Sequence, residues 1–276
     1  MKHKFPLLLA IVAIAGMAIG AYYLFKTGKI GQILNEETQT SEDMKELFNG
    51  EVDTFITEEG GTLDIFSIKH ASIAMRAGDK WIYFDPVTSG AMPVTDFDKA
   101  PKADYIFMTH DHYDHFDSLA VKQLRKEGTR VFANRNTIDA LGSGEAMANG
   151  DSLVTEEGWT VEAVPAYNNS PEKLGFHPQG RDNGYVLTIG GLRVYVAGDL
   201  EVIPELALLK DIDIAFLPCN LPYTMSPEQC AQAARIIGPK VLFPYHYGGT
   251  DTPTDLQRLV DLLDGTGIEV RIRMYE

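Results

Sequence analysis

Metal-binding side chains are dense in one short segment of the chain. Three of the seven histidines fall within six residues, in the run Thr109-His110-Asp111-His112-Tyr113-Asp114-His115. Alternate residues at the end of a strand point to the same side, so His110 and His112 can bind one metal ion. The turn that follows can bring Asp114 and His115 to a second ion. Imidazole with carboxylate and no thiolate favours zinc, as one or two ions, with manganese or iron as alternatives.

Two later residues lie just past apolar strands, where αβ folds place their chemistry. Asp199 follows the run Val194-Tyr195-Val196-Ala197-Gly198, and a carboxylate there can bridge two metal ions. His246 follows the predicted strand Val241–Phe243. The sequence therefore predicts six metal ligands: His110, His112, Asp114, His115, Asp199 and His246.

These residues resemble the signature of the metallo-β-lactamase superfamily: His110-x-His112-x-Asp114-His115, then Gly198-Asp199, then a late His246. The resemblance covers roughly residues 51–276. It is strongest to the branch of the ascorbate-6-phosphate lactonases and the N-acyl phosphatidylethanolamine phospholipases D, through the stretches 164–167, 181–185, 198–201 and 222–225.

The resemblance implies an α+β fold, a four-layer αβ/βα sandwich with the metals in the cleft between two sheets. Residue by residue, it implies that His110 and His112 hold the first metal and that Asp199 bridges the two. The second metal would then be held by Asp114, His115 and His246.

The chain departs from the family's pattern at one ligand of the first metal. Where the superfamily usually has a third histidine, this chain has Tyr167-Asn168-Asn169. The neutral amide of Asn168 is a weaker zinc ligand than imidazole. Either the first site is weak, or a nearby group such as His177 completes it. His177 is equally well explained as an exposed loop histidine or a substrate contact.

Two further polar residues end predicted strands. The resemblance places His70, after Leu63–Lys69, and Asp85, after Trp81–Phe84, near the metal cleft. Asp85 could orient a liganding histidine from there. The alternatives are a core histidine with its hydrogen bonds satisfied and a turn-forming Asp-Pro pair.

The elements that must position these residues are strands first and then a mixture of strands and helices, a pattern that indicates packed sheets with helices outside. Ala103–Met108 is a nearly continuous apolar run, typical of a strand covered on both faces. Ser226-Pro227-Glu228-Gln229 predicts a helix start with a capping box, and Gly238-Pro239 ends that helix. Asp117 caps a second predicted helix that runs to about Lys126, and a third is predicted near Thr254–Leu263. The remaining predicted strands are Ser72–Arg76, Arg130–Ala133, Trp159–Val164, Gly184–Ile189, Leu192–Ala197, Ile212–Leu217 and Ile268–Arg273.

The amino terminus differs in composition from the rest of the chain. Residues 5–25 include no charged side chain, and an apolar segment of this length is long enough to span a bilayer. We therefore expect residues 1–26 to be an uncleaved membrane anchor, residues 27–50 a linker and residues 51–276 the catalytic domain. This predicts a single-pass protein of the cytoplasmic membrane with its domain outside the cytoplasm. A cleaved signal peptide, giving a secreted or periplasmic domain, is the alternative.

Composition narrows the range of functions. The formal net charge of −15 disfavours sequence-independent nucleic-acid binding. The two cysteines, Cys219 and Cys230, form no CxxC pair, which argues against a disulfide scaffold and a structural zinc knuckle.

The chemistry that these observations predict is hydrolysis by a metal-activated water, with Asp114 or Asp199 accepting the proton. The chain contains no G-x-S-x-G elbow, so a serine hydrolase is not supported. The expected substrate is a small or lipid-derived ester, lactone or phosphodiester. A non-catalytic metal-binding or sensor domain, tethered to the membrane, is the alternative, and Asn168 makes it credible.

Overall fold

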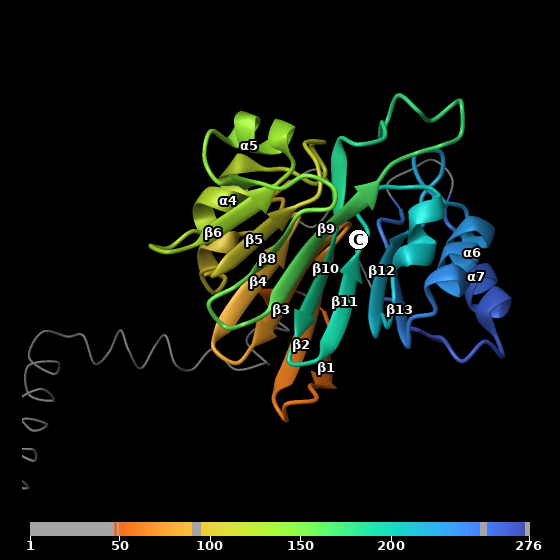
Figure 1. Ribbon diagram of the computed structural model, residues 1–276, viewed down its shortest axis with the longest axis horizontal. Helices are drawn as coiled ribbons and strands as arrows, with labels where there is room; N and C mark the ends of the chain where they lie inside the picture. Colours follow the sequence, from red (N-terminus) through yellow and green to blue (C-terminus); the bar gives the residue numbers. More distant parts are fainter. Residues whose placement is uncertain (1–46, 49, 90–94, 249–252, 274–276) are drawn as a thin grey trace, which may run out of the picture. The chain divides into compact units, whose positions relative to one another are not determined.

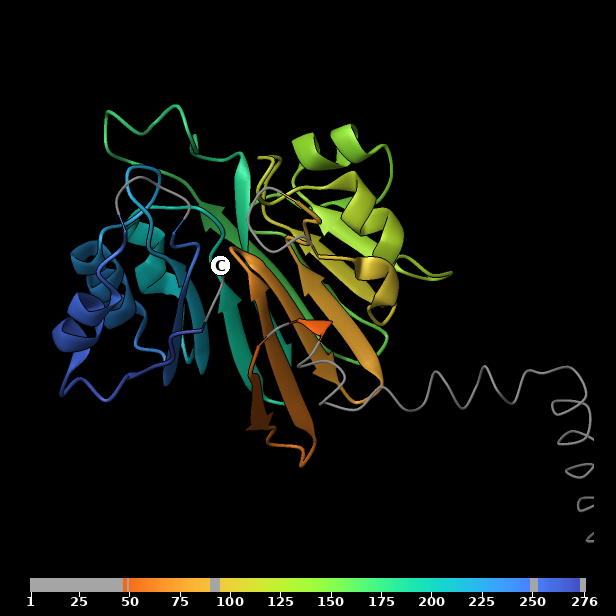
Figure 2. The same ribbon diagram turned by 180° about the vertical axis from the view of Figure 1, so that it is seen from behind.

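The computed structural model describes residues 47–48, 50–89, 95–248 and 253–273, which all belong to one compact unit, Lys45–Glu276. Within them, two sheets pack face to face, and helices cover the outer face of each sheet (Figures 1 and 2). The order of layers is helix, sheet, sheet, helix. This confirms the predicted α+β sandwich of four layers.

The first sheet has the strand order β1-β2-β3-β4-β5-β6-β7. Strands β1 to β4 are antiparallel neighbours, whereas β4 to β7 run parallel. Helices α4 (Ser118–Leu124) and α5 (Arg135–Leu141) lie on this side of the molecule. The strands are β1 (Val52–Ile56), β2 (Thr62–Lys69), β3 (Ser72–Ala77), β4 (Lys80–Phe84), β5 (Tyr105–Met108), β6 (Arg130–Ala133) and β7 (Glu145–Ala146).

The second sheet repeats this topology with the strand order β8-β9-β10-β11-β12-β13-β14. Strands β8 to β11 are antiparallel neighbours and β11 to β14 run parallel. Helices α6 (Pro227–Ile237) and α7 (Leu256–Leu263) lie on this side. The strands are β8 (Ser152–Val154), β9 (Thr160–Ala166), β10 (Asp182–Ile189), β11 (Leu192–Val196), β12 (Ile214–Pro218), β13 (Val241–Tyr245) and β14 (Glu269–Val270).

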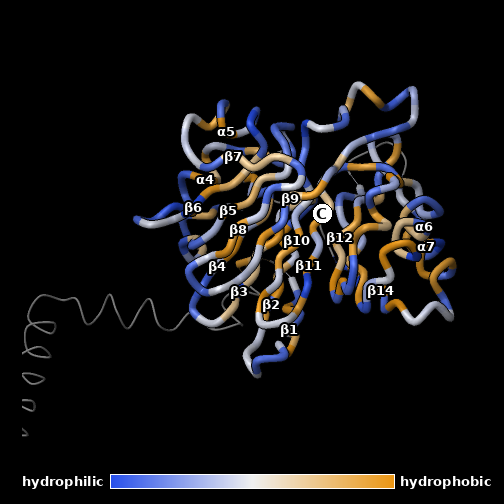
Figure 3. The backbone as a smooth tube through the Cα atoms, in the orientation of Figure 1, coloured by the Kyte–Doolittle hydropathy of each residue, from blue (hydrophilic) through white to orange (hydrophobic). Residues whose placement is uncertain are grey.

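Two apolar clusters hold the layers together. One joins inward-facing residues of both sheets, including Phe84, Phe107 and Tyr185, and the other packs α6 and α7 onto the second sheet. In Figure 3 the apolar segments accordingly gather along the central strands. Strand β5 is buried at all four positions, as the continuous apolar run predicts for a strand covered on both faces.

Local signals placed most helix starts correctly. Ser226 and Gln229 form both bonds of the capping box, and Gly238 ends α6 with a left-handed φ of 65°. Asp117 accepts a hydrogen bond from the backbone of Leu119 as the cap of α4. Helix α5, capped by Asn134, was not predicted, because it spans seven residues and carries little amphipathic signal. Strands β1, β7 and β8 were also missed, and the predicted strand Ile268–Arg273 is reduced to β14.

The prediction of a membrane protein must be corrected. In the part of the chain that the structure describes, no helix is both long and apolar enough to cross a membrane. Its longest α-helix, α6, has 11 residues, or about 17 Å at 1.5 Å per residue, against a hydrocarbon core of about 30 Å. The single-pass topology, the anchor and the exported location are therefore not retained. Residues 1–26, the predicted anchor, lie outside the described residues, as does nearly all of the linker 27–50.

Candidate metal centre

The candidate ligands meet because six strands end at one edge of the molecule. Strands β2, β4 and β5 run in the same direction in the first sheet, as do β9, β11 and β13 in the second. A hydrogen bond from the Asn183 backbone to the Thr109 carbonyl, 3.1 Å long, joins the two sheets at this edge. The residues just beyond these carboxyl ends supply every side chain of the centre.

His110, His112 and His177 form the first group. One ring nitrogen from each lies within 4.8 Å of the others. Their ring centroids are 4.5 Å (His110 to His112), 4.9 Å (His110 to His177) and 4.8 Å (His112 to His177) apart. His110 and His177 are buried, and His112 is partly exposed.

His70, Asp114, His115 and His246 form the second group, again with one ligand atom from each within 4.8 Å of the others. The Asp114 Oδ2 atom lies 3.1 Å from His70 Nε2 and 3.6 Å from His246 Nε2. The rings of His70 and His246 have centroids 3.9 Å apart.

Asp199 lies between the two groups. Its Oδ2 atom is 3.4 Å from His177 Nε2 and 3.1 Å from His246 Nε2, and its Oδ1 atom is 3.3 Å from His115 Nε2. Asp199 also forms a third cluster with His110 and His115. A carboxylate that contacts histidines of both groups is positioned to bridge two ions.

Buried carboxylates orient one histidine of each group. Asp85 Oδ2 accepts from His115 Nδ1 at 2.8 Å, which leaves Nε2 of His115 free to face the centre. Thr109 holds Asp85 in place through its backbone N–H and its hydroxyl, both at 2.7 Å. Asp182 Oδ2 lies 3.3 Å from His177 Nδ1 and orients that ring in the same way. Carboxylate–histidine pairs of this kind set the tautomer of a metal ligand.

The charges of the centre shift its pKa values strongly. Burial and the neighbouring His246 lower the pKa of His70 to about 4, and burial together with His115 lowers the pKa of His110 well below its usual value. Burial opposes charge on His246, but Asp199 and Asp114 outweigh it and raise its pKa to about 9. Burial also opposes charge on Asp199, whose pKa is nevertheless held well below its usual value by His246 and His115.

The donor set fits a pair of divalent metal ions. Nε2 of His110, His115 and His246 and Oδ1 of Asp199 are buried without a hydrogen-bond partner in the structure. Unsatisfied buried polar atoms cost free energy, and here they all belong to residues of the ligand clusters. Imidazole and carboxylate are the ligands of zinc, manganese and iron sites.

His177, and not Asn168, is the residue that lies beside His110 and His112. The Asn168 amide donates to the Tyr223 carbonyl at 2.8 Å, and its backbone N–H donates to the His177 carbonyl at 2.8 Å. Asn168 therefore ties together the loops that follow β9 and β12. The alternative of an exposed loop histidine is wrong for His177, which is 2% exposed.

A buried ion pair fastens the loop that carries His177. Lys173 Nζ lies 3.0 Å from Glu201 Oε1 and donates to the Thr224 carbonyl at 2.7 Å. Glu201 also accepts from the backbone N–H groups of Ser170 and Asn169. The pair thus joins the β9–β10 loop to the segment that follows Asp199.

The structure brings together all six predicted ligands, along with His70, His177 and Asp85. Sequence reasoning missed Asp182, Thr109 and Glu201. Asp182 is at the start of an apolar strand, and Asp85 is just past the end of one. A carboxylate at the end of a strand was therefore the signal from which Asp182 could have been predicted. Asp111, inside the histidine motif, belongs to none of the three ligand groups.

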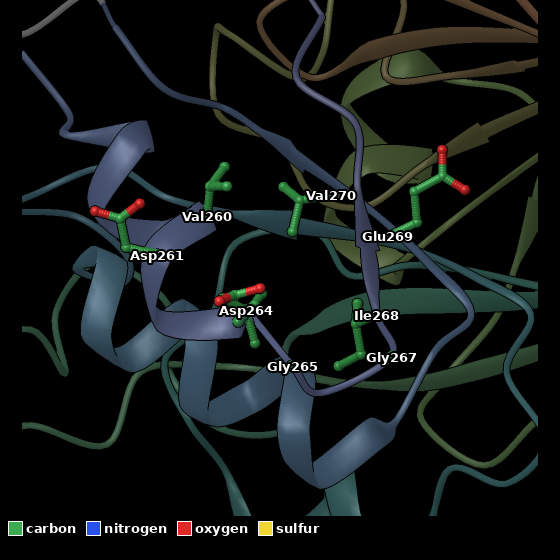
Figure 4. A pocket seen from close by; sticks show the side chains of 9 residues that line it. Val260, Asp261, Asp264, Gly265, Gly267, Ile268, Glu269 and Val270 are labelled. Atoms are coloured by element: carbon green, nitrogen blue, oxygen red, sulfur yellow. The ribbon is translucent and has the colours of Figure 1, made fainter.

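A cavity elsewhere in the molecule lies between α7 and β14 (Figure 4). Its lining includes Asp261, Asp264 and Glu269 but none of the histidines, so it is separate from the metal centre.

Comparison with known proteins supports both the fold and the chemistry of this centre. Residues 80–247 match the beta-lactamase superfamily domain. A UPF0173 metal-dependent hydrolase of Thermococcus kodakarensis is 30% identical over 203 residues, covering 69% of this chain and 89% of that protein. A Thermus thermophilus relative of the same description is 29% identical over 189 residues, covering 67% and 84%.

Solved structures agree. A Parabacteroides distasonis protein, described as a candidate metal-dependent hydrolase, is 46% identical with a TM-score of 0.78, covering 82% of this chain and all of that one. The metallo hydrolase Igni18 of Ignicoccus hospitalis shares the fold, with a TM-score of 0.62 at 21% identity over 80% of this chain and 94% of its own.

Proposed function

The chain belongs to the beta-lactamase superfamily and is a metal-dependent hydrolase, and from this premise we propose that it cleaves an ester, lactone or phosphodiester bond at a two-metal centre. The observation that carries the proposal is the convergence of two groups of ligands on Asp199. We propose zinc as the ion, with manganese or iron as alternatives. The resemblance to the lactonase and phospholipase branch stays a prediction.

We propose that His110, His112 and His177 hold the first ion and that Asp114, His115 and His246 hold the second, with Asp199 shared. Bound metal supplies a Lewis acid and lowers the pKa of water from about 15.7 toward roughly 7. Asp85 and Asp182 keep His115 and His177 in the tautomer that presents Nε2.

The proton of the attacking water goes to a carboxylate of the centre. Asp199 has a side chain only 3% exposed, whereas that of Asp114 is 23% exposed. A proton accepted by the Asp114 carboxylate could therefore pass on to solvent, whereas Asp199 is shielded from solvent. Burial of the surrounding histidines excludes water from the rest of the centre and strengthens its electrostatic interactions.

The competing interpretation, a non-catalytic metal-binding or sensor domain, rested on Asn168 in place of a third histidine. The grouping of His177 with His110 and His112 removes that argument. The proposed substrate is a small molecule. A lipid-derived substrate remains one candidate, without the support of a membrane anchor.

The proposal is tested with the purified chain, loaded with zinc or manganese, on a panel of p-nitrophenyl esters, lactones and bis(p-nitrophenyl) phosphate. We expect Asp114→Asn to lower kcat by at least tenfold, while Asp111→Asn, a change inside the same motif but outside the ligand groups, leaves it nearly unchanged. Full metal loading with no hydrolysis of any compound in the panel would count against this substrate range. Equal activity in the two variants would reject the assignment of Asp114.

A further inference from the structure

His70 contacts the second group closely although its place in the sequence suggests no ligand role. It directly follows β2, far from the histidine motif, and its Nε2 atom lies 3.1 Å from Asp114 Oδ2. Its ring lies 3.9 Å from that of His246, and its carbonyl accepts the backbone N–H of His246 at 3.0 Å. His70 is therefore attached to two of the ligands assigned to the second ion.

The backbone at this position supports a role for the imidazole itself. Among the described residues, four non-glycine residues have a positive φ, and three of them are in the centre: His70 (45°), Asp85 (41°) and His246 (50°). A left-handed conformation is unfavourable for an L-residue with a large side chain, and strain of this kind gathers at functional sites. A glycine would relieve the strain at position 70, so a histidine there indicates that its ring is needed.

We propose that His70 is a direct ligand of the second metal ion, so that this ion has four ligands of its own besides the shared Asp199, one more than the first ion has. The proposal rests on the two-metal function above and adds that the two ions have different roles. The ligand atoms of His70, Asp114, His115 and His246 all lie within 4.8 Å of one another, as the ligands of a single ion do.

The two ions then differ in how completely the protein surrounds them. His110, His112 and His177 make a group of three, and the shared Asp199 adds one ligand to each group. The first ion would thus have one protein ligand fewer than the second, and catalytic metal sites keep a position free for water or substrate. We therefore infer that the second ion binds first and holds the strand ends together, and that the first ion carries the chemistry.

A different role for His70, as a hydrogen-bond donor that only orients Asp114, predicts another outcome. A glutamine at position 70 can place its amide nitrogen near the position of Nε2 and still donate to Asp114, but it cannot supply an imidazole ligand. His70→Gln therefore separates the two roles, and His70→Ala removes both.

The second site is measured alone in a His177→Ala background, which disables the first group. Apo-protein is titrated with Co²⁺, whose visible absorption reports the coordination of the ion, and bound metal is counted by elemental analysis. We expect His70→Gln and His70→Ala each to weaken the site by roughly 100-fold or more, beyond the 10- to 100-fold range of groups that only orient a ligand. Asp111→Asn in the same background is the control and should bind as tightly as the parent.

An affinity for Co²⁺ in His70→Gln within tenfold of the parent, with an unchanged spectrum, would overturn the proposal. If the position 70 variants do not fold, the Co²⁺-loaded His177→Ala protein decides. Its NMR spectrum should show paramagnetically shifted imidazole N–H signals from three ligands (His70, His115 and His246), and signals from only two would also overturn it. Both readouts are independent of hydrolysis, so an inactive but normally loaded protein would contradict the proposed function and leave this inference standing.

Discussion

Asp85→Asn should selectively damage the second metal site, although the side chain touches no ion. Asp85 is fully buried and accepts three hydrogen bonds, two from Thr109 and one from His115 Nδ1. In the variant, the amide oxygen must face the Thr109 backbone N–H, because the amide nitrogen would place two donors against each other. The amide nitrogen then faces His115 Nδ1.

This orientation forces His115 into the wrong tautomer. Nδ1 must become the acceptor, so the ring proton moves to Nε2, the atom that faces Asp199 at 3.3 Å. A protonated Nε2 cannot bind metal. Loss of an orienting partner typically lowers metal affinity 10- to 100-fold. At about 1.4 kcal/mol per decade, this corresponds to about 1.4–2.8 kcal/mol of binding free energy.

The assay is titration of the apo-protein with zinc, followed by competition with a chelator of known affinity. Asp182→Asn is the matched control, because Asp182 contacts His177 and should weaken the first site instead. Combining each change with His177→Ala, which leaves only the second group, shows which site is affected. The reasoning is refuted if Asp85→Asn binds zinc at the second site as tightly as the parent, or if both variants weaken the same site.

Four further outcomes are expected. His177→Ala should reduce bound zinc from two ions toward one, as measured by elemental analysis, and two retained ions would show that His177 is not a ligand. Asn168→His should not raise first-site occupancy, because His177 already supplies the third imidazole; a rise in titrated affinity would contradict this. Glu201→Ala leaves Lys173 without its buried partner and should cost about 3–5 kcal/mol in chemical denaturation, whereas the exposed Glu228→Ala control should change the stability far less. Chelation should lower Tm, because metal present at 1,000 times its Kd stabilises the fold by about 4 kcal/mol, and an unchanged Tm would mean that the centre does not bind metal in the folded state.

Asn168 shows what could not be predicted from the order of residues along the chain. From the sequence, either Asn168 left the first site weak or a nearby group such as His177 completed it. Their order along the chain could not decide, because the β9–β10 loop carries no periodic pattern from which its path can be derived. The structure brings His177 back over the strand ends and turns Asn168 toward the carbonyl of Tyr223.

The amino terminus shows the limit of inference from composition. An apolar stretch near the start of the chain suggested a membrane span because its length matches a bilayer. Composition establishes only that the apolar stretch has enough residues to cross a bilayer. In the described part of the chain, the longest α-helix is much shorter than a bilayer is thick.

The sequence by itself determined the features encoded by neighbouring residues. The spacing of His110, His112, Asp114 and His115, the apolar strand before them and the capping box at Ser226 each arise from contacts within a few residues, so their patterns are visible along the chain. The overall architecture also followed, through a resemblance that extends over most of the domain.

Only the tertiary structure decided which distant residues join the centre. His70 follows β2, whereas His177 lies in the β9–β10 loop and Asp182 begins β10, and each is an ordinary polar residue in its own segment. They become a metal centre because strands of two sheets end at one edge, where burial removes water and leaves ring nitrogens to be satisfied by a metal ion or by one another. That convergence depends on the register and packing of both sheets, which no local pattern in the sequence records.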